Sequence, residues 1–247
     1  MHTPTYRKCD GADTAVMFIH GFMGSPDQFE DMAETVHSLG CACISVLLPG
    51  HGCGIDGFVK FGERQWMRHV QNEIDKIKND YKKIFLVGHS MGGLLALNAG
   101  MVAENNISGA VLIASPMKIN LLNPSAMAQR LRFLRLPRDS EIKTAYMNTY
   151  SLTKSKFFYY PLFIRPAASL MRLMKRTKRR LSEVTIPICM FYSKKDETTS
   201  YKSARILYDG LCNTQRTVFS LEKSWHVFYS GEEQEIIRAK LIEFIQK

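Results

Sequence analysis

The chain has 247 residues, of which 45% are hydrophobic and 23% are charged, a balance that allows a sizeable buried core. An α/β fold of this length commonly forms one domain, so we expect residues 1–247 to form a single domain. No stretch approaches about 18 uninterrupted apolar residues and the N-terminus lacks the regions of a secretory signal. We therefore expect a cytoplasmic protein rather than a membrane-spanning or secreted one.

The six cysteines give no sign of a redox or metal centre. They include no C-x-x-C pair and no grouping with histidine at metal-ligand spacing. We expect buried free thiols, and the sequence implies no metal and no organic cofactor.

Strand-like and helical segments alternate along most of the chain. Strands are predicted near 6–9, over 15–19, 42–48, 83–87 and 109–114, and near 187–192 and 217–221. Helices are predicted over 25–39, 64–81, 93–98, 201–211 and 232–245. Such alternation is typical of a mostly parallel sheet with helices on both faces, so we predict the α/β class with six or seven strands.

The first two long helices carry specific signals. Ser25, Pro26 and Gln28 have the spacing of an N-cap, a first-turn proline and the third position of a capping box, and Gly40 would end that helix. In the second helix, over 64–81, four residues at helical spacing are expected to face inward: Trp66, Val70, Ile74 and Ile77.

Ser90 lies at the centre of a G-x-S-x-G motif. The motif follows the strand-like run 83–87 and precedes the helical run 93–98. In this setting it predicts a nucleophile elbow, because flanking glycines let strand and helix pack closely while a strained turn exposes the serine hydroxyl.

A serine hydroxyl needs a base and an orienting carboxylate to act as a nucleophile at neutral pH. Asp196 follows the apolar run 186–192, and His226 follows the strand-like run 217–221. Both positions lie where strands would end, at the rim where open α/β sheets place their chemistry. We therefore predict Ser90, Asp196 and His226 as the catalytic residues.

Acyl transfer also needs backbone N–H donors for the oxyanion of the tetrahedral intermediate. The glycine-rich segment 20–26 follows the predicted strand 15–19. Its glycines would let the chain turn so that the Phe22 amide joins the Met91 amide at the site. We predict these two N–H groups as the oxyanion hole.

At this point the chain resembles the α/β-hydrolase family, and within it the small bacterial carboxylesterases and monoacylglycerol lipases. The resemblance runs through the segments HGFMGSP, PGHG, GHSMGG, SKKDE and SWHVF. It implies an inserted helical cap at about 117–185, where the alternation of strands and helices breaks down. It also favours Asp196 over Glu197 as the acid, because it puts the acid at the first position.

The predicted reaction is hydrolysis of a carboxylic ester through an acyl-enzyme on Ser90, with His226 as general base. Thioesterase, peptidase, acyltransferase and carbon–carbon hydrolase activities of the same fold stay open, because fold alone does not choose among them. A non-catalytic ligand receptor that kept a hydrolase pocket is an alternative from another class. The sequence makes no prediction of the oligomeric state.

Three other histidines lie close to these motifs. His20 and His51 fall in glycine-rich loops, and we expect them to hydrogen-bond loop backbone near the site. His89 precedes the nucleophile in a tight turn, so its side chain is expected to point away from the position of the base.

The predicted cap carries the positive charge of the protein. Residues 118–180 contain 15 Lys and Arg against two acidic residues, whereas the rest of the chain has 18 basic and 21 acidic residues. One helical side near its end is basic: Arg172, Lys175, Arg176, Arg179 and Arg180. The opposite side is apolar: Leu170, Met171, Met174 and Leu181.

Three interpretations of this basic helix are open: a solvated face over a pocket, attraction to an anionic membrane surface or substrate, and nucleic-acid binding. We do not expect nucleic acid as a partner, because no stacking aromatics interrupt the charge run. Upstream, residues 157–163 are densely aromatic and would form either cap core or the lining of a pocket for an apolar acyl group.

Overall fold

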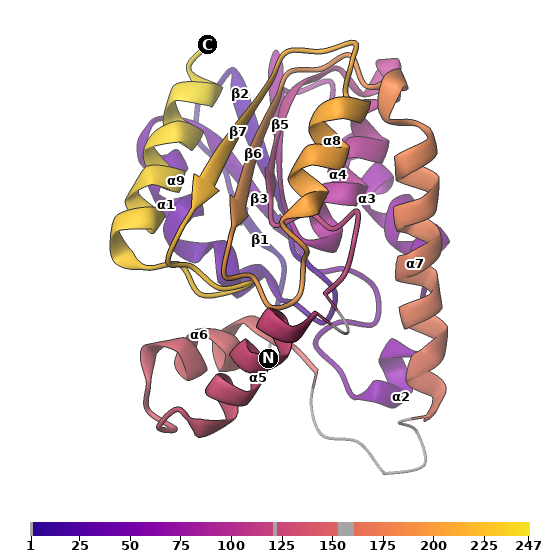
Figure 1. The fold of residues 1–247 in the computed structure, drawn as a ribbon. Helices are drawn as coiled ribbons and strands as arrows, with labels where there is room; N and C mark the ends of the chain where they lie inside the picture. Colours follow the sequence, from indigo (N-terminus) through magenta and orange to yellow (C-terminus); the bar gives the residue numbers. More distant parts are fainter. Residues whose placement is uncertain (1, 121–122, 153–160) are drawn as a thin grey trace.

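The computed structural model describes residues 2–120, 123–152 and 161–247. Its centre is a seven-stranded sheet in the order β1-β3-β2-β4-β5-β6-β7 (Figure 1). The strands are β1 (Thr5–Arg7), β2 (Thr14–Ile19), β3 (Ala42–Val46), β4 (Lys83–His89), β5 (Ile107–Ile113), β6 (Ile188–Ser193) and β7 (Arg216–Leu221). Only β1 pairs in the antiparallel sense, with β3. The predicted α/β class and a strand number of seven are confirmed.

Helices cover both faces of this sheet (Figure 1). The α-helices are α1 (Glu30–Ser38), α2 (Ile55–Phe58), α3 (Glu63–Ile77), α4 (Met91–Gly100), α5 (Pro124–Arg135), α6 (Glu141–Thr149), α7 (Ile164–Arg179), α8 (Lys202–Gly210) and α9 (Gly231–Ile245). Helices α1 and α9 bury one apolar cluster against the sheet, and α3, α4, α7 and α8 bury a larger one on the other face. Continuous apolar strands such as β2 and β4 are buried between the two clusters, as parallel sheets require.

The start of the first helix differs from the prediction. Residues Pro26–Phe29 form a 3₁₀ turn, η1, and the α-helix begins only at Glu30. Ser25 makes no capping hydrogen bond, because its hydroxyl donates to the Asn148 carbonyl at 3.4 Å. Ser25 is the N-cap residue and Pro26 the first-turn proline of this 3₁₀ turn, as predicted, but the side-chain hydrogen bond of a capping box is absent. Gly40 ends the helix as expected, with a φ of +83°.

Helix α3 confirms the second amphipathic pattern, although it ends at Ile77 rather than near residue 81. All four predicted inward residues are buried: Trp66, Val70, Ile74 and Ile77. The helix is tied to α7 through an ion pair between Glu63 and Arg172, with a distance of 2.7 Å.

The β5–β6 segment, residues 114–187, contains α5, α6, α7 and the short 3₁₀ turn η4 (Leu181–Glu183). Helices α5 and α6 lie beyond the carboxyl ends of the strands, and α7 runs alongside the sheet layer and packs on α3 and α4 (Figure 1). The basic helical pattern is confirmed in α7, where Leu173, Met174 and Thr177 are buried. Met171 was expected on the apolar side but is 51% exposed, so it does not share the side of α7 that buries Leu173, Met174 and Thr177.

Part of the aromatic patch in this segment, residues 157–160, lies outside the described residues. Phe163 belongs to an aromatic cluster under the loop after β2, with ring centroids 5.5 Å from Phe22 and 5.8 Å from Phe58. It is absent from the lining of the cavity next to Ser90. For Phe163, the core interpretation is the one that the structure supports.

The cysteines are all unpaired thiols, but only Cys43 and Cys189 are buried, so the expectation of buried thiols holds for these two alone. Across the described ranges, no helix has the length and apolarity needed to cross a membrane.

Candidate active site

Ser90 lies on a sharp turn between β4 and α4. Its backbone angles are φ 52° and ψ −119°, a conformation that a residue with a side chain rarely adopts. The neighbouring glycines permit the close packing: a Cβ on Gly88 would lie 2.4 Å from the Gly93 nitrogen, and one on Gly92 would lie 1.9 Å from the Ile19 carbonyl oxygen. Local geometry thus agrees with the predicted elbow.

The structure brings Ser90, His226 and Asp196 together, although they lie on three separate loops. The Ser90 Oγ is 3.1 Å from His226 Nε2, and His226 Nδ1 is 2.9 Å from Asp196 Oδ2. All three residues are buried. Asp196 is oriented in turn by its other oxygen, Oδ1, which accepts from the backbone N–H groups of Thr198 at 2.8 Å and Thr199 at 2.6 Å.

This arrangement determines the proton positions on His226. With an acidic partner at Nδ1, the proton is assigned to that nitrogen, which leaves the Nε2 lone pair directed at the Ser90 hydroxyl. Burial disfavours the imidazolium, but the negative charges of Asp196 and Glu197 outweigh it and raise the pKa of His226 above its ordinary value. The ring can therefore accept the serine proton and hold it beside Asp196.

The backbone at 21–24 forms a turn next to the serine. The Gly24 N–H donates to the Gly21 carbonyl at 3.0 Å, and the residue with positive φ is Met23, at 62°. The sequence analysis had assigned the special conformation to the glycines of this loop. Met23 can adopt it because its own N–H donates to His51 Nε2 at 3.2 Å and its carbonyl accepts from the Ser151 N–H at 2.9 Å.

Phe22 from this turn and Met91 at the first position of α4 both lie near Ser90. Within the described part of the chain, neither backbone N–H has a hydrogen-bond partner. For Met91 this follows from its place in the first helical turn, where N–H groups lack intrahelical acceptors. Phe22, Ser90 and His226 line one cavity of about 80 Å³. Met91 directly follows Ser90 and begins α4, but it is not among the residues that line this cavity.

His20 and His51 hold the loops around the site. His20 Nε2 accepts from the Leu48 N–H at 3.0 Å, and His51 Nδ1 contacts the Leu48 carbonyl at 3.2 Å. Burial lowers the pKa of both rings, to about 4 for His51, so both are neutral. Each ring then has one accepting nitrogen: His20 Nε2 accepts from the Leu48 N–H, and His51 accepts from the Met23 N–H at Nε2 while its Nδ1–H donates to the Leu48 carbonyl. The expectation that they bind loop backbone is confirmed.

His89 does not point away from the base, which corrects the sequence analysis. Its Nε2 lies 2.9 Å from the main-chain oxygen of His226, and the two rings have centroids 4.9 Å apart. Among the described residues, Nδ1 is buried without a partner. Burial and the neighbouring His226 lower the pKa of His89 to about 3, so this ring is a neutral donor that holds the His226 loop.

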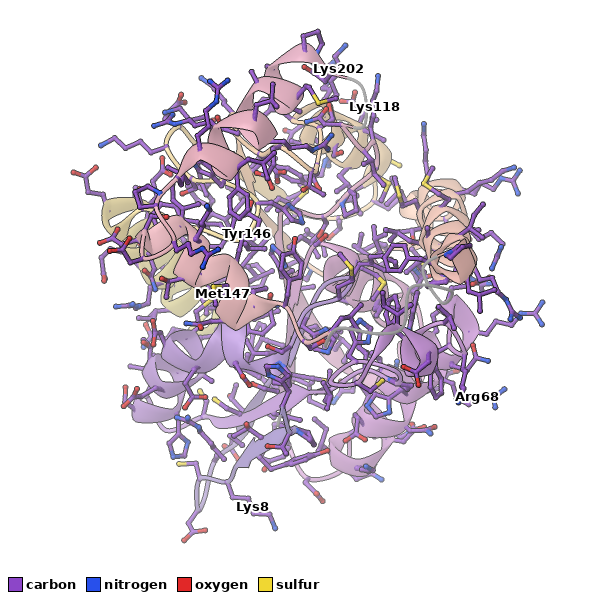
Figure 2. All side chains as sticks on the ribbon, turned by 90° about the horizontal axis from the view of Figure 1, so that it is seen from below. Lys8, Arg68, Lys118, Tyr146, Met147 and Lys202 are labelled. Atoms are coloured by element: carbon purple, nitrogen blue, oxygen red, sulfur yellow. The ribbon has the colours of Figure 1, made fainter. Side chains whose placement is uncertain are left out.

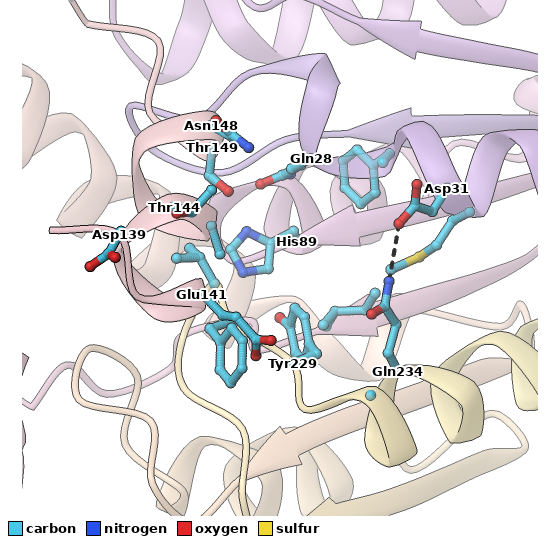
Figure 3. Close-up of a pocket in the computed structure, with 17 residues that line it drawn as sticks. Gln28, Asp31, His89, Asp139, Glu141, Thr144, Asn148, Thr149, Tyr229 and Gln234 are labelled. Atoms are coloured by element: carbon cyan, nitrogen blue, oxygen red, sulfur yellow. Dashed lines mark hydrogen bonds between the residues drawn. The ribbon is translucent and has the colours of Figure 1, made fainter. Parts of the chain in front are cut away.

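A larger pocket of about 650 Å³ lies beside the cavity (Figure 3). The two share four lining residues: Gln28, His89, Thr149 and Val227. Its wall includes three carboxylates, from Asp31, Asp139 and Glu141, and Asp31 is bonded to Gln234 at 3.2 Å.

The β5–β6 segment also supplies residues to the cavity. Thr149, Tyr150 and Leu170 line it together with the loops that carry Ser90 and His226. Helical periodicity had placed Leu170 on the apolar side of the basic helix, but no local motif distinguishes Thr149 and Tyr150, because their role depends on how α6 packs against the carboxyl ends of the strands.

A serine on a strained turn between strand and helix, with a histidine and a carboxylate at the carboxyl edge of a mostly parallel sheet, defines a protein of the α/β-hydrolase class. Residues 10–234 match the family described as serine aminopeptidase, S33, and the chain belongs to this family. The resemblance inferred from the motifs is thereby confirmed.

Known relatives span nearly the whole chain. The thermostable monoacylglycerol lipase of Bacillus sp. (strain H-257) is 27% identical over 96% of this chain and 92% of its own length. The carboxylesterase of Bacillus subtilis (strain 168) is 24% identical over 99% and 97%. The crystal structure of Paleococcus ferrophilus monoacylglycerol lipase superposes with a TM-score of 0.75 at 17% identity, covering 98% of this chain and 97% of that one. At that identity, the likeness to the crystal structure concerns the fold.

Proposed function

We propose that the protein is a serine hydrolase that cleaves carboxylic esters through an acyl-enzyme on Ser90. The observation that carries the proposal is the series of contacts from Ser90 Oγ to His226 and on to Asp196, with Ser90 and His226 lining a cavity. The relatives named as a monoacylglycerol lipase and a carboxylesterase favour esters over other acyl substrates.

The reaction follows from these contacts. His226 Nε2 takes the Ser90 proton as Oγ attacks the ester carbonyl, and the Phe22 and Met91 N–H groups stabilise the oxyanion. Collapse of the tetrahedral intermediate expels the alcohol, which receives the proton from His226. Water, deprotonated by the same ring, then attacks the acyl-enzyme. Collapse of the second tetrahedral intermediate releases the carboxylic acid, and His226 returns the proton to Ser90 Oγ. Asp196 keeps the proton on Nδ1 throughout and stabilises the imidazolium.

In this proposal the β5–β6 segment, including residues 117–185, is a cap inserted into a single α/β domain. The support is its contribution of Thr149, Tyr150 and Leu170 to the cavity wall. These residues would contact an apolar acyl group and so influence which chain lengths are accepted.

A substrate series tests the function. We expect hydrolysis of p-nitrophenyl esters between acetate and palmitate, with a maximum that measures the acyl pocket, and monoacylglycerols serve as the comparison for a lipase. Aminoacyl p-nitroanilides test the peptidase alternative, which the family description favours. Hydrolysis of the anilides without the esters would reverse the assignment. Binding of esters without turnover of any substrate would favour the receptor.

We also propose that the outward side of α7 attracts anionic lipid. Lys175, Arg176 and Arg179 are exposed there, whereas Arg172 is paired with Glu63 and Arg180 with Glu183. Each cation near an anionic surface adds about 1 kcal/mol.

Co-sedimentation with phosphatidylserine-containing vesicles should therefore exceed that with neutral vesicles. The double substitution Lys175→Glu with Arg179→Glu should remove the difference. A matched pair of exposed lysines outside α7, Lys8→Glu with Lys83→Glu, changes the net charge by the same amount and should preserve most of the difference. Equal, negligible sedimentation of the parent with both kinds of vesicle would refute the proposal.

A further inference from the structure

Glu197, the residue after Asp196, places a second carboxylate beside His226. Its side chain is 5% exposed. One oxygen, Oε1, accepts from the Tyr146 hydroxyl at 2.5 Å and the Thr198 hydroxyl at 3.1 Å, and Oε2 accepts from the His226 main-chain N–H at 3.2 Å. All three partners donate, which is the environment of an ionised carboxylate.

The β5–β6 segment holds Glu197 in this position from two helices. Tyr146 belongs to α6 and is buried, whereas the next residue, Met147, is 73% exposed; both are labelled in Figure 2. Arg130 belongs to α5, and its guanidinium donates to the main-chain oxygens of Glu197 at 2.8 Å and Asn120 at 2.7 Å. The loop that carries Asp196 and Glu197 is therefore bonded to both α5 and α6.

We propose that Glu197 is a positioning residue for His226: it anchors the main chain of the histidine and places a second negative charge beside the imidazolium, with α5 and α6 keeping it there. The catalytic meaning of this role rests on the proposed function. A buried charge acts through a lower effective dielectric than an exposed one, so its influence on the ring is strong. The Glu197 side chain provides both the hydrogen bond to the His226 main chain and the negative charge. Glutamine, a neutral isostere, removes the charge but keeps an oxygen that can accept this hydrogen bond.

The other groups around His226 have constant charge near neutral pH. His89, from β4, is neutral because burial lowers its pKa to about 3. Burial raises the pKa values of the surrounding tyrosines, which are Tyr146, Tyr150, Tyr192 and Tyr229, so these stay protonated. Ser90 is uncharged. Arg130 carries a positive charge and contacts the main-chain oxygen of Glu197. Besides Glu197, Asp196 is the other carboxylate beside the ring. His226 therefore titrates against a fixed set of charges.

The test is Glu197→Gln, with two readouts: the titration of the His226 imidazole by NMR, and the pH dependence of kcat/KM on the best p-nitrophenyl ester. A negative charge raises the pKa of His226, so its removal should lower that pKa. The neutral base then persists to lower pH, and the midpoint of the acid limb should move down by about 1 pH unit. The plateau of kcat/KM should fall about tenfold, because the imidazolium of the transition state loses the same stabilisation.

Glu73→Gln is the matched control. Glu73 is also 5% exposed and also accepts from a tyrosine, Tyr6, but it lies on α3 and does not contact His226. Its substitution should leave the His226 midpoint unchanged. A purely structural loss from removing a buried carboxylate would lower stability in both variants without shifting the titration in either.

An unshifted His226 midpoint in folded Glu197→Gln overturns the inference. If that variant does not fold, Tyr146→Phe decides: it removes one donor but keeps the charge, so the His226 pKa should stay or rise, and a fall overturns the inference. The NMR titration needs no turnover. Absence of hydrolysis by the parent would therefore count against the proposed function, and an unshifted midpoint against the role of Glu197.

Discussion

Replacing Ser90 with alanine should reduce ester hydrolysis by at least about 10⁴-fold while leaving the protein folded. The substitution removes the attacking oxygen, and His226 and Asp196 then have no nucleophile to activate. The fold should survive because the hydroxyl makes one hydrogen bond within the described residues, to His226, and alanine keeps the Cβ at the strained turn. Initial rates and thermal unfolding of the two proteins measure both parts of the expectation.

Two controls make this result specific. Ser38→Ala alters an exposed serine on α1 whose hydroxyl donates to the Thr35 carbonyl at 2.7 Å, and it should keep the parental rate. A serine-reactive phosphonate should label the parent at Ser90 and leave Ser90→Ala unlabelled. Hydrolysis by Ser90→Ala at a rate comparable to that of the parent would show that another group carries out the reaction.

Replacing Gly92 with alanine should lower the free energy of unfolding by about 3 kcal/mol or more. A Cβ at this position would lie 1.9 Å from the carbonyl oxygen of Ile19 and 2.6 Å from its carbonyl carbon. Both are backbone atoms in β2, so no side-chain rotation can relieve the clash, and α4 must move away from the sheet. Urea denaturation of parent and variant gives the difference.

Gly231→Ala is the matched control for this effect. Gly231 is the first residue of α9, and a Cβ there would meet no atom within 4 Å. Alanine restricts the unfolded chain and favours the helix, so stability should stay equal or rise by up to about 1 kcal/mol. Similar losses in the two variants would contradict the argument from close packing at the elbow.

Local signals predicted most of the fold. The apolar runs identified strands β2 to β6, because continuous apolar residues mark strands that are buried on both faces. The edge strands β1 and β7 are only partly buried, and β1 lies at Thr5–Arg7 rather than near 6–9. Boundaries shifted where a tertiary contact competed with a local one. The Ser25 hydroxyl, expected to cap a helix, instead donates to Asn148 in α6, more than a hundred residues away.

The turn at Ser90 and the loop after β2 show the same division. Ser90 could be predicted because strand, turn and helix are contiguous, and small residues at fixed positions are a local requirement of that turn. The loop after β2 was also found, but the residue that adopts positive φ there is Met23 rather than a glycine. Two hydrogen bonds with residues distant in sequence hold that conformation: the Met23 N–H donates to His51, and the Met23 carbonyl accepts from the Ser151 N–H.

The sequence by itself determined the succession of strands and helices along the chain and the three residues proposed for acyl transfer, because each of the three lies in the loop after a recognisable strand. The tertiary structure alone decided what surrounds them. From the sequence, Glu197 is only an alternative to Asp196 as the acid, and the His89 side chain is expected to point away from His226. In the structure both residues contact His226. The contacts of Glu197 with α5 and α6 depend on how the β5–β6 segment packs over the strand ends, and no periodicity or spacing records such long-range packing.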